Sequence, residues 1–204
     1  MKKLFLASSF KDVSNVFEKF AGDIKGKSVS FIPTASIVEK VNFYVSSGKK
    51  ALEKMGLIID ELEISSTDKN EIENKLKKND FIYITGGNTF FLLQELRKSG
   101  ADRIIVEQIA TGKVYIGESA GAMVIAPNIE YVKAMDSIKK APDLTDFDGL
   151  GIVDFYPVPH HTNFPFKSAV EKIITAYDSS LKLCPISNKQ AILFDNDELR
   201  IESV

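Results

Sequence analysis

Short apolar runs alternate with longer amphipathic stretches from residue 3 to residue 125 of this 204-residue chain. The apolar runs are rich in Phe, Val and Ile and end at turn residues. This pattern predicts strands that are buried on both faces, as in a parallel sheet. We expect such strands at residues 3–7, 28–33, 57–64, 81–85 and 113–117.

The stretches between these runs carry apolar residues at helical spacing. They predict helices at 13–20, 36–56, 71–78, 90–98 and 101–111, and Ser66, Thr67 and Asp68 are suitable capping residues for the third. Regular alternation of strand and helix indicates an α/β fold, with a mostly parallel sheet flanked by helices. In such sheets functional groups gather at the carboxyl ends of the strands.

The pattern changes after residue 126. Residues 129–134 are a candidate strand, and 135–151 have little periodicity, which predicts a long surface loop. A helix is expected at 169–177 and closing strands at 184–186, 191–195 and 198–202. The last two form a C-terminal β-hairpin that turns at Asn196 and Asp197. This hairpin can cover the core or pair across a homodimer. Nothing resembles a linker, so we expect a single domain over residues 1–204.

Composition narrows the class of protein. A hydrophobic content of 44% is enough for a sizeable core, and a formal net charge of −2 argues against a nucleic-acid partner. No apolar run is long enough to span a bilayer, so no membrane partner is expected. The single cysteine, Cys184, excludes an internal disulfide, suits a cytoplasmic location and is expected to be a buried thiol.

The most informative stretch is 114–126, where an apolar run leads into Gly117-Glu118-Ser119-Ala120-Gly121 and then into small, helix-compatible residues. Gly-x-Ser-x-Gly between a strand and a helix is the nucleophile-elbow pattern, which lifts the serine hydroxyl clear of the sheet. Ser119 is therefore the candidate nucleophile. The alternative is a tight turn with a serine that has no catalytic role.

A serine hydroxyl needs a base to accept its proton, and histidine is suited to this near neutral pH. The chain has only two histidines, His160 and His161, which are adjacent and follow Pro159 at the end of an apolar run. Neighbouring side chains at a strand end point in different directions, so at most one should face Ser119. The alternative is an exposed histidine pair. A metal site is not expected, because no Cys or Glu lies at metal-ligand spacing from them.

A second glycine turn, Gly86-Gly87, follows the strand predicted at 81–85. Its backbone can approach a substrate closely, which makes the Gly87 N–H a candidate oxyanion-hole donor together with the Ala120 N–H. Asn88 and Thr89 are then candidates for binding the polar ends of a substrate. The alternative is an ordinary turn at the start of a helix.

Three motifs in order, Gly-Gly-Asn-Thr-Phe at 86–90, Tyr-Ile-Gly-Glu-Ser-Ala-Gly-Ala at 115–122 and Pro-His-His-Thr-Asn at 159–163, resemble the peptidase E family. That family is related to cyanophycinase and has a core similar to class I glutamine amidotransferases, with three layers. The resemblance implies Ser119 as the nucleophile, His160 as the general base, and the Gly87 and Ala120 N–H groups as the oxyanion hole. It also implies hydrolysis of dipeptides with an N-terminal aspartate through an acyl-enzyme, without metal or cofactor.

The chain departs from this family in two places. The third triad member is usually an acid shortly after the region of Cys184, but residues 187–190 are Ser-Asn-Lys-Gln. Asn188 can orient an imidazole by a hydrogen bond, as Asn does in papain-like sites. Asp136 is the alternative orienter, or a substrate contact.

The second departure concerns recognition of an aspartate side chain, for which Arg is the preferred partner. The arginines, Arg97, Arg103 and Arg200, all lie far from His160 in sequence. Two further hypotheses stay open: a hydrolase of another small amide or ester, and a catalytically silent module that binds an amino acid or peptide, which the missing acid at 187–190 favours.

Overall fold

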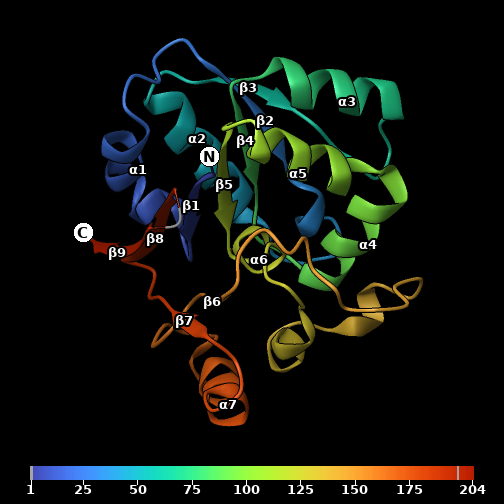
Figure 1. The fold of residues 1–204 in the computed structure, drawn as a ribbon, viewed down its shortest axis with the longest axis vertical. Coiled ribbons are helices and arrows are strands. Elements are labelled where there is room, and N and C mark those ends of the chain that lie inside the picture. Colours follow the sequence, from blue (N-terminus) through green and yellow to red (C-terminus); the bar gives the residue numbers. More distant parts are fainter. Residues whose placement is uncertain (1, 197) are drawn as a thin grey trace.

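The structure is a computed structural model that describes residues 2–196 and 198–204 (Figure 1). The described residues form a seven-stranded sheet in the order β3-β2-β4-β5-β1-β8-β9. The first five of these strands are parallel, while β8 is antiparallel to β1 and β9 is antiparallel to β8. In sheet order their bounds are β3 Ile58–Glu61, β2 Ser28–Ile32, β4 Phe81–Ile84, β5 Val114–Glu118, β1 Lys3–Ala7, β8 Gln190–Asp195 and β9 Glu198–Ser203.

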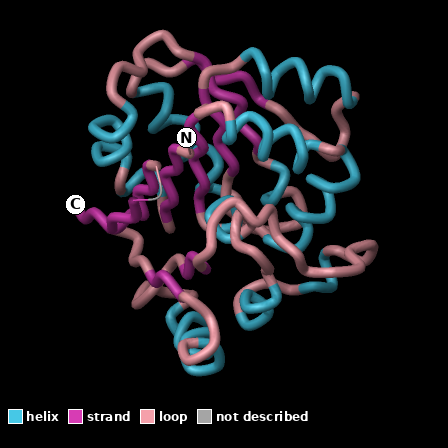
Figure 2. The backbone as a smooth tube through the Cα atoms, viewed as in Figure 1, coloured by secondary structure: helices cyan, strands magenta, loops and turns pink. Residues whose placement is uncertain are grey.

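Helices cover both faces of this sheet, which gives three layers (Figures 1 and 2). The helices α1 (Ser14–Ala21) and α2 (Phe43–Lys54) pack on one face, and α3 (Lys69–Lys78), α4 (Thr89–Ser99) and α5 (Ala101–Ala110) on the other. Successive side chains of a strand point to opposite faces, so each strand supplies both cores. In β1, Phe5 belongs to the core under α1 and α2, whereas Leu4 and Leu6 belong to the core under α3, α4 and α5.

The predicted α/β sheet and its hairpin are confirmed, and most predicted elements lie within a few residues of the observed ones. The helix predicted over 36–56 was too long. A 3₁₀ turn spans Thr34–Ser36, an exposed loop follows, and α2 begins only at Phe43. In this loop Ile37 and Val41 are exposed and Val38 is half-buried, so helical spacing there did not reflect a buried face.

The strand predicted at 129–134 was wrong, because Glu130–Ala134 is a 3₁₀ helix. The side chain of Asn128 accepts a hydrogen bond from the Glu130 N–H at 2.8 Å, which starts a local turn instead of a ladder. The strand predicted at 184–186 exists as β7 (Leu183–Pro185). It pairs with β6 (Tyr156–Val158) in a separate two-stranded sheet.

The C-terminal hairpin extends the main sheet. Residues Ile192, Leu193 and Phe194 of β8 are buried beside β1, whereas Ile201 of β9 is 43% exposed at the sheet edge. The hairpin therefore does cover the core, and pairing across a dimer stays a prediction. Asp197 in its predicted turn lies outside the described residues. Cys184 is buried, as expected.

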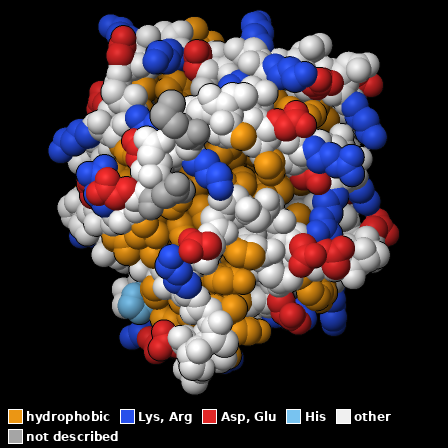
Figure 3. All heavy atoms as spheres, viewed as in Figure 1, with side chains coloured by type: hydrophobic (Ala, Val, Ile, Leu, Met, Phe, Trp, Pro, Cys, Tyr) orange, Lys and Arg blue, Asp and Glu red, His pale blue; other side chains and the backbone are white. Residues whose placement is uncertain are grey.

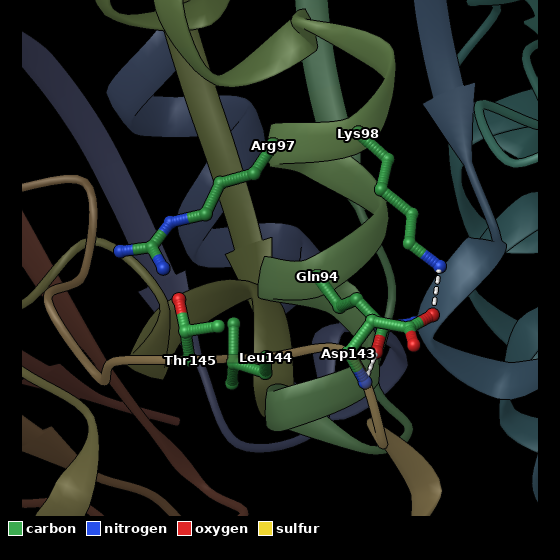
Figure 4. A pocket seen from close by; sticks show the side chains of 6 residues that line it. All are labelled: Gln94, Arg97, Lys98, Asp143, Leu144 and Thr145. Carbon is green, nitrogen blue, oxygen red and sulfur yellow. Dashed lines mark hydrogen bonds and ion pairs between the residues drawn. The ribbon is translucent and has the colours of Figure 1, made fainter.

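The loop expected at 135–151 is pinned to α4 through polar contacts (Figure 4). The Asp143 N–H donates to Gln94 Oε1 at 2.8 Å, and Lys98 Nζ lies 2.6 Å from the Asp143 carboxylate. Close by, Arg97 forms an ion pair with Asp146 at 2.7 Å. These contacts hold the loop that carries Asp136 against α4.

The surface shows basic and acidic side chains interspersed over one face, with apolar areas between them (Figure 3). No helix in residues 2–196 and 198–204 has the length and apolar character that crossing a membrane requires. The α7 helix (Lys167–Tyr177) completes the structure beside the two-stranded sheet, and its buried residues Val170 and Ile173 face the larger core.

Candidate active site

Ser119 stands at a sharp turn between β5 and the short helix α6 (Ala120–Met123). Its backbone has φ 50° and ψ −105°, a conformation that is strained for a residue with a side chain. The flanking glycines make the turn possible. A Cβ on Gly117 would lie 2.5 Å from the Gly121 carbonyl oxygen, and one on Gly121 would lie 2.3 Å from the Ile84 oxygen. The Gly-x-Ser-x-Gly motif therefore has the local geometry that the pattern predicts.

His160 faces Ser119 from a loop that is far away in sequence. Its Nε2 lies 2.8 Å from Ser119 Oγ, which is hydrogen-bond distance. The loop is held by the residue directly after β1, because the His160 N–H donates to Ser8 Oγ at 2.9 Å. His161 donates its backbone N–H to the Ile186 oxygen, and no hydrogen bond to Ser119 is found for its ring among the described residues. Of the two histidines, the structure thus brings His160 to Ser119.

The other ring nitrogen of His160 is held by an amide. Nδ1 lies 2.9 Å from Asn188 Oδ1, and the Asn188 N–H donates to Asn163 Oδ1 at 2.8 Å. Because an amide oxygen only accepts, this contact favours the tautomer with the proton on Nδ1. The lone pair of Nε2 then points at the Ser119 hydroxyl, as a general base requires.

Burial lowers the pKa of His160 below its usual 6.5, and the hydrogen bond that His160 Nδ1 donates to Asn188 opposes this effect only in part. The ring of Phe166 stacks on the imidazole with a centroid distance of 4.6 Å, which accounts for part of the burial. A lowered pKa keeps His160 neutral at pH 7, so it is able to accept a proton there.

The two candidate oxyanion donors border the same serine. A Cβ on Gly86 would lie 3.2 Å from Ser119 Cβ, so this loop runs directly beside the nucleophile. Gly87 has φ +138°, and a Cβ there would lie 2.1 Å from the Ala35 oxygen, so only glycine fits. Ala120 is the first residue of α6, so its N–H has no acceptor within the helix.

Asn88 and Thr89 mainly make internal contacts. Asn88 caps α4 by accepting from the Phe91 N–H, and its Nδ2 donates to the Ser137 oxygen at 3.1 Å. Thr89 donates its N–H and hydroxyl to Asp136 Oδ2 at 2.8 and 2.6 Å. These residues therefore join the oxyanion loop to the loop after the elbow, and their role in binding substrate stays a prediction.

Asp136 contacts Thr89, whereas the far nitrogen of His160 faces Asn188. The structure therefore places Asp136 away from the orienting position. Burial raises the pKa of Asp136 to about 6, with the two hydrogen bonds from Thr89 opposing the shift. The second role that the sequence suggested, a substrate contact, remains compatible with its place beside the oxyanion loop.

Sequence reasoning missed several residues of the site. Tyr44 of α2 lies beside the oxyanion loop, with its Cε2 atom 3.5 Å from the position of a Cβ on Gly86. Burial, followed by the charge of Glu39, raises the pKa of Tyr44 to about 12. Phe166 and Ser8, which pack and hold His160, were also missed. No motif marks any of these positions, because each depends on a contact between distant segments.

Arg97, the arginine that Figure 4 shows, is engaged elsewhere. Its guanidinium donates to Asp146 and to the Asp148 oxygen, each at 2.7 Å. Within the described residues no arginine forms a hydrogen bond with Ser119 or His160. The described residues also contain no cluster of three or more His, Cys, Asp or Glu that could hold a metal ion.

Similarity to known proteins agrees with this geometry. The chain matches peptidase family S51 over residues 4–202. It is 56% identical to an uncharacterized peptidase of Listeria monocytogenes, covering 98% of this chain and 97% of the relative. It is 58% identical to another from Pasteurella multocida, covering 97% and 95%. Peptidase E of Salmonella arizonae is 31% identical over 70% of this chain and 59% of that protein.

Solved structures show the same fold. A protein of Listeria monocytogenes EGD-e, provisionally identified as a peptidase E, superposes with a TM-score of 0.97 at 55% identity, covering 100% and 99% of the two chains. A peptidase from an acI-B1 Actinobacterium shares the fold at a TM-score of 0.73 and 21% identity, covering 100% of this chain and 88% of that one. The predicted relationship to peptidase E is confirmed, and the chain belongs to peptidase family S51.

Proposed function

We propose that this protein is a serine peptidase that hydrolyses short peptides through an acyl-enzyme on Ser119. His160 is the general base, and Asn188 orients it. The Gly87 and Ala120 N–H groups form the oxyanion hole. The observation that carries the proposal is the pair of contacts on one imidazole, at 2.8 Å to Ser119 Oγ and 2.9 Å to Asn188 Oδ1.

In the proposed reaction, His160 accepts the Ser119 proton while Oγ attacks the carbonyl carbon of the peptide. The carbon–nitrogen bond then breaks, and the imidazolium gives its proton to the leaving amine. A water molecule next attacks the acyl-enzyme while His160 takes one of its protons. That proton returns to Ser119 Oγ as the carboxylic acid leaves, so the enzyme is regenerated.

An Asn in the third position supplies orientation without a negative charge. It holds the tautomer that leaves Nε2 free, but it cannot stabilise the imidazolium electrostatically as a carboxylate does. We therefore propose a slower enzyme than one with an acid at that position.

We propose peptides with an N-terminal aspartate as substrates, but with only a modest preference for aspartate. The charged groups that act on Tyr44 beside the nucleophile are carboxylates, namely Glu39, Glu118 and Asp136. The Lys140 ammonium group donates to the oxygen of Val38, the residue before Glu39, at 2.7 Å, and is the candidate cation for a substrate carboxylate. A lysine is a weaker partner for a carboxylate than a bidentate arginine, so discrimination by this site is expected to be small.

The test compares Ser119→Ala, His160→Ala and His161→Ala with the wild type on a panel of dipeptides and acyl esters. Hydrolysis is expected to disappear in the first and to fall by a factor on the order of 10³ or more in the second. His161→Ala is the matched control, because it removes an adjacent imidazole outside the proposed triad. It should stay within a few-fold of the wild type, as a rough expectation for a residue without a catalytic contact.

Covalent labelling by a fluorophosphonate reports on the nucleophile directly. The wild type should gain the mass of one label on Ser119, and Ser119→Ala should gain none. Full activity in Ser119→Ala would refute the mechanism. A wild type that neither hydrolyses the panel nor accepts the label would support the silent binding module instead.

A further inference from the structure

The candidate nucleophile and its base follow strands of two different sheets. Ser119 comes directly after β5 of the main sheet, whereas His160 and Asn188 come after β6 and β7 of the separate two-stranded sheet (Figure 1). Proton transfer requires the Ser119 hydroxyl and the His160 imidazole to stay within hydrogen-bond distance. The contacts that join the two sheets therefore determine whether this pair is in place.

The base and its orienter are held together within the two-stranded sheet. Beyond the paired strands, the Ile186 N–H donates to the Val158 oxygen and the His161 N–H donates to the Ile186 oxygen, each at 3.0 Å. These two bonds hold the chain on both sides of His160 next to the segment that carries Asn188. The contact between His160 Nδ1 and Asn188 Oδ1 is thus internal to this unit.

Two consecutive residues at the end of β1 contact both sheets. The Ala7 oxygen accepts a hydrogen bond from the Ser119 N–H at 2.9 Å, which extends the ladder between β1 and β5. The next residue, Ser8, is only 2% exposed. Its hydroxyl group donates to the Ile186 oxygen at 3.0 Å and accepts from the His160 N–H at 2.9 Å. The Ser8 side chain therefore joins the two-stranded sheet to the strand that also holds the nucleophile.

The backbone of His160 depends on this contact. Its φ is +66°, in the left-handed region that residues with a side chain seldom adopt, and such a conformation persists where the surrounding contacts determine it. No other acceptor for the His160 N–H is found among the described residues. Without the Ser8 hydroxyl this N–H would be unpaired, whereas the Ile186 oxygen would keep its bond from His161.

We propose that Ser8 is a positioning residue whose hydroxyl group docks the two-stranded sheet on the end of β1 and so sets the distance between His160 Nε2 and Ser119 Oγ. The proposal rests on the proposed function, because it concerns proton transfer within that pair. A displacement of reacting groups by about 1 Å can lower a rate by roughly 10²-fold. Ser8 is buried and out of reach of a substrate, so losing its hydroxyl group should lower kcat and leave KM nearly unchanged.

The test uses the full chain and the dipeptide that the wild type hydrolyses fastest. Ser8→Ala removes the hydroxyl group, and Ser8→Cys keeps a similar shape with a weaker donor and acceptor. Ser30→Ala is the matched control, because the hydroxyl of this buried serine in β2 also donates to a carbonyl oxygen, that of Lys75, and accepts from an N–H group, that of Asn79, each at 3.0 Å. Each kcat is divided by the fraction of Ser119 that a fluorophosphonate labels at completion, so that a smaller folded fraction does not count as slower chemistry.

We expect Ser8→Ala to lower kcat per labelled site by at least about tenfold, with KM within about threefold of the wild type. The kcat of Ser8→Cys should lie between those of Ser8→Ala and the wild type. Ser30→Ala loses comparable hydrogen bonds far from the site, so its kcat should stay within about threefold of the wild type. The proposal is overturned if Ser8→Ala keeps its kcat, if the loss falls on KM, or if Ser30→Ala loses as much.

The pH profile separates a displaced sheet from a disordered base. If Ser8 docks the two-stranded sheet as a unit, the contact between His160 and Asn188 survives in Ser8→Ala, and the acidic limb of kcat/KM should stay where it is in the wild type. Burial lowers the pKa of His160, so an imidazole that left its place would titrate at higher pH. A limb that moved to higher pH in Ser8→Ala would therefore overturn the docking role.

If Ser8→Ala does not fold, Ser8→Cys decides. It should lower kcat per labelled site more than Ser30→Cys does, and equal values in the two variants would overturn the proposal. The activity of Ser119→Ala separates the two levels of inference. If that variant keeps its activity, the proposed function fails. If it is inactive while Ser8→Ala keeps its kcat, only the role of Ser8 fails.

Discussion

Replacing Asn188 with aspartate tests how the site works without an acid in the third position. The substitution puts a carboxylate in place of an amide oxygen that lies 2.9 Å from His160 Nδ1. The backbone hydrogen bond from Asn188 to Asn163 is independent of this side chain, so the loop should keep its place. The variant therefore changes the charge beside the imidazole with little change in shape.

The magnitude follows from the distance. Two unit charges about 4 Å apart attract by about 4 kcal/mol at an effective dielectric constant of 20. The carboxylate loses part of its hydration in this half-buried position, which offsets part of that attraction. A net stabilisation of the imidazolium by about 1–2 kcal/mol corresponds to an increase in kcat of roughly tenfold.

The pH dependence gives a second readout. A carboxylate favours the protonated imidazole, so Asn188→Asp should raise the pKa of His160 and move the acidic limb of kcat/KM to higher pH. Asn188→Ala removes the hydrogen bond that holds this pKa up against burial, so the limb should move to lower pH. In that variant kcat should also fall, by roughly 10- to 100-fold, because a hydrogen bond to a charged group is lost in the transition state.

The assay is a pH profile of dipeptide hydrolysis for the three proteins, with active sites counted by fluorophosphonate labelling. If Asn188→Asp were slower than the wild type and its acidic limb did not move, Asn188 would not be the partner of His160 in the reaction. The electrostatic reasoning would then be refuted.

Three further predictions follow from the same site. Gly87→Ala would place a Cβ 2.1 Å from the Ala35 oxygen at a φ of +138° and so displace the Gly87 N–H. The rate of hydrolysis in a steady-state assay should therefore fall by at least roughly 100-fold, which is the scale of a lost oxyanion donor. Glu118 and Asp136 have pKa values raised to about 7 and about 6 in the folded state, so the stability they contribute is full at low pH and is lost as pH rises through those values. The free energy of unfolding in urea should thus fall from pH 5 to pH 8, by about 2.5 kcal/mol for Glu118 alone, and a flat profile would contradict its buried environment. The kcat/KM for the dipeptide Asp-Leu should exceed that for Ala-Leu by less than about tenfold. A ratio on the order of 10³ would contradict this prediction, because it would require a cation in the active site that the contacts around Ser119 and His160 do not include.

Much of this protein could be predicted from its sequence because the signals involved are local. The strands were visible from apolar runs, since a strand buried on both faces needs apolar residues throughout. The elbow was visible because Gly117 and Gly121 are required by contacts within a few residues of Ser119 or with the neighbouring strand. The histidines could be singled out because the chain has no others.

The tertiary structure decided everything that depends on which loops meet at the carboxyl edge of the sheet. It brought His160 rather than His161 to Ser119, and Asn188 rather than Asp136 to the imidazole. It also revealed that the Glu118 carboxyl group accepts hydrogen bonds from the Phe10 N–H and the Tyr83 hydroxyl. The physical reason is that hydrophobic periodicity and turn chemistry act over a few residues, whereas these contacts join side chains more than twenty residues apart, whose directions are set only when the sheet has formed.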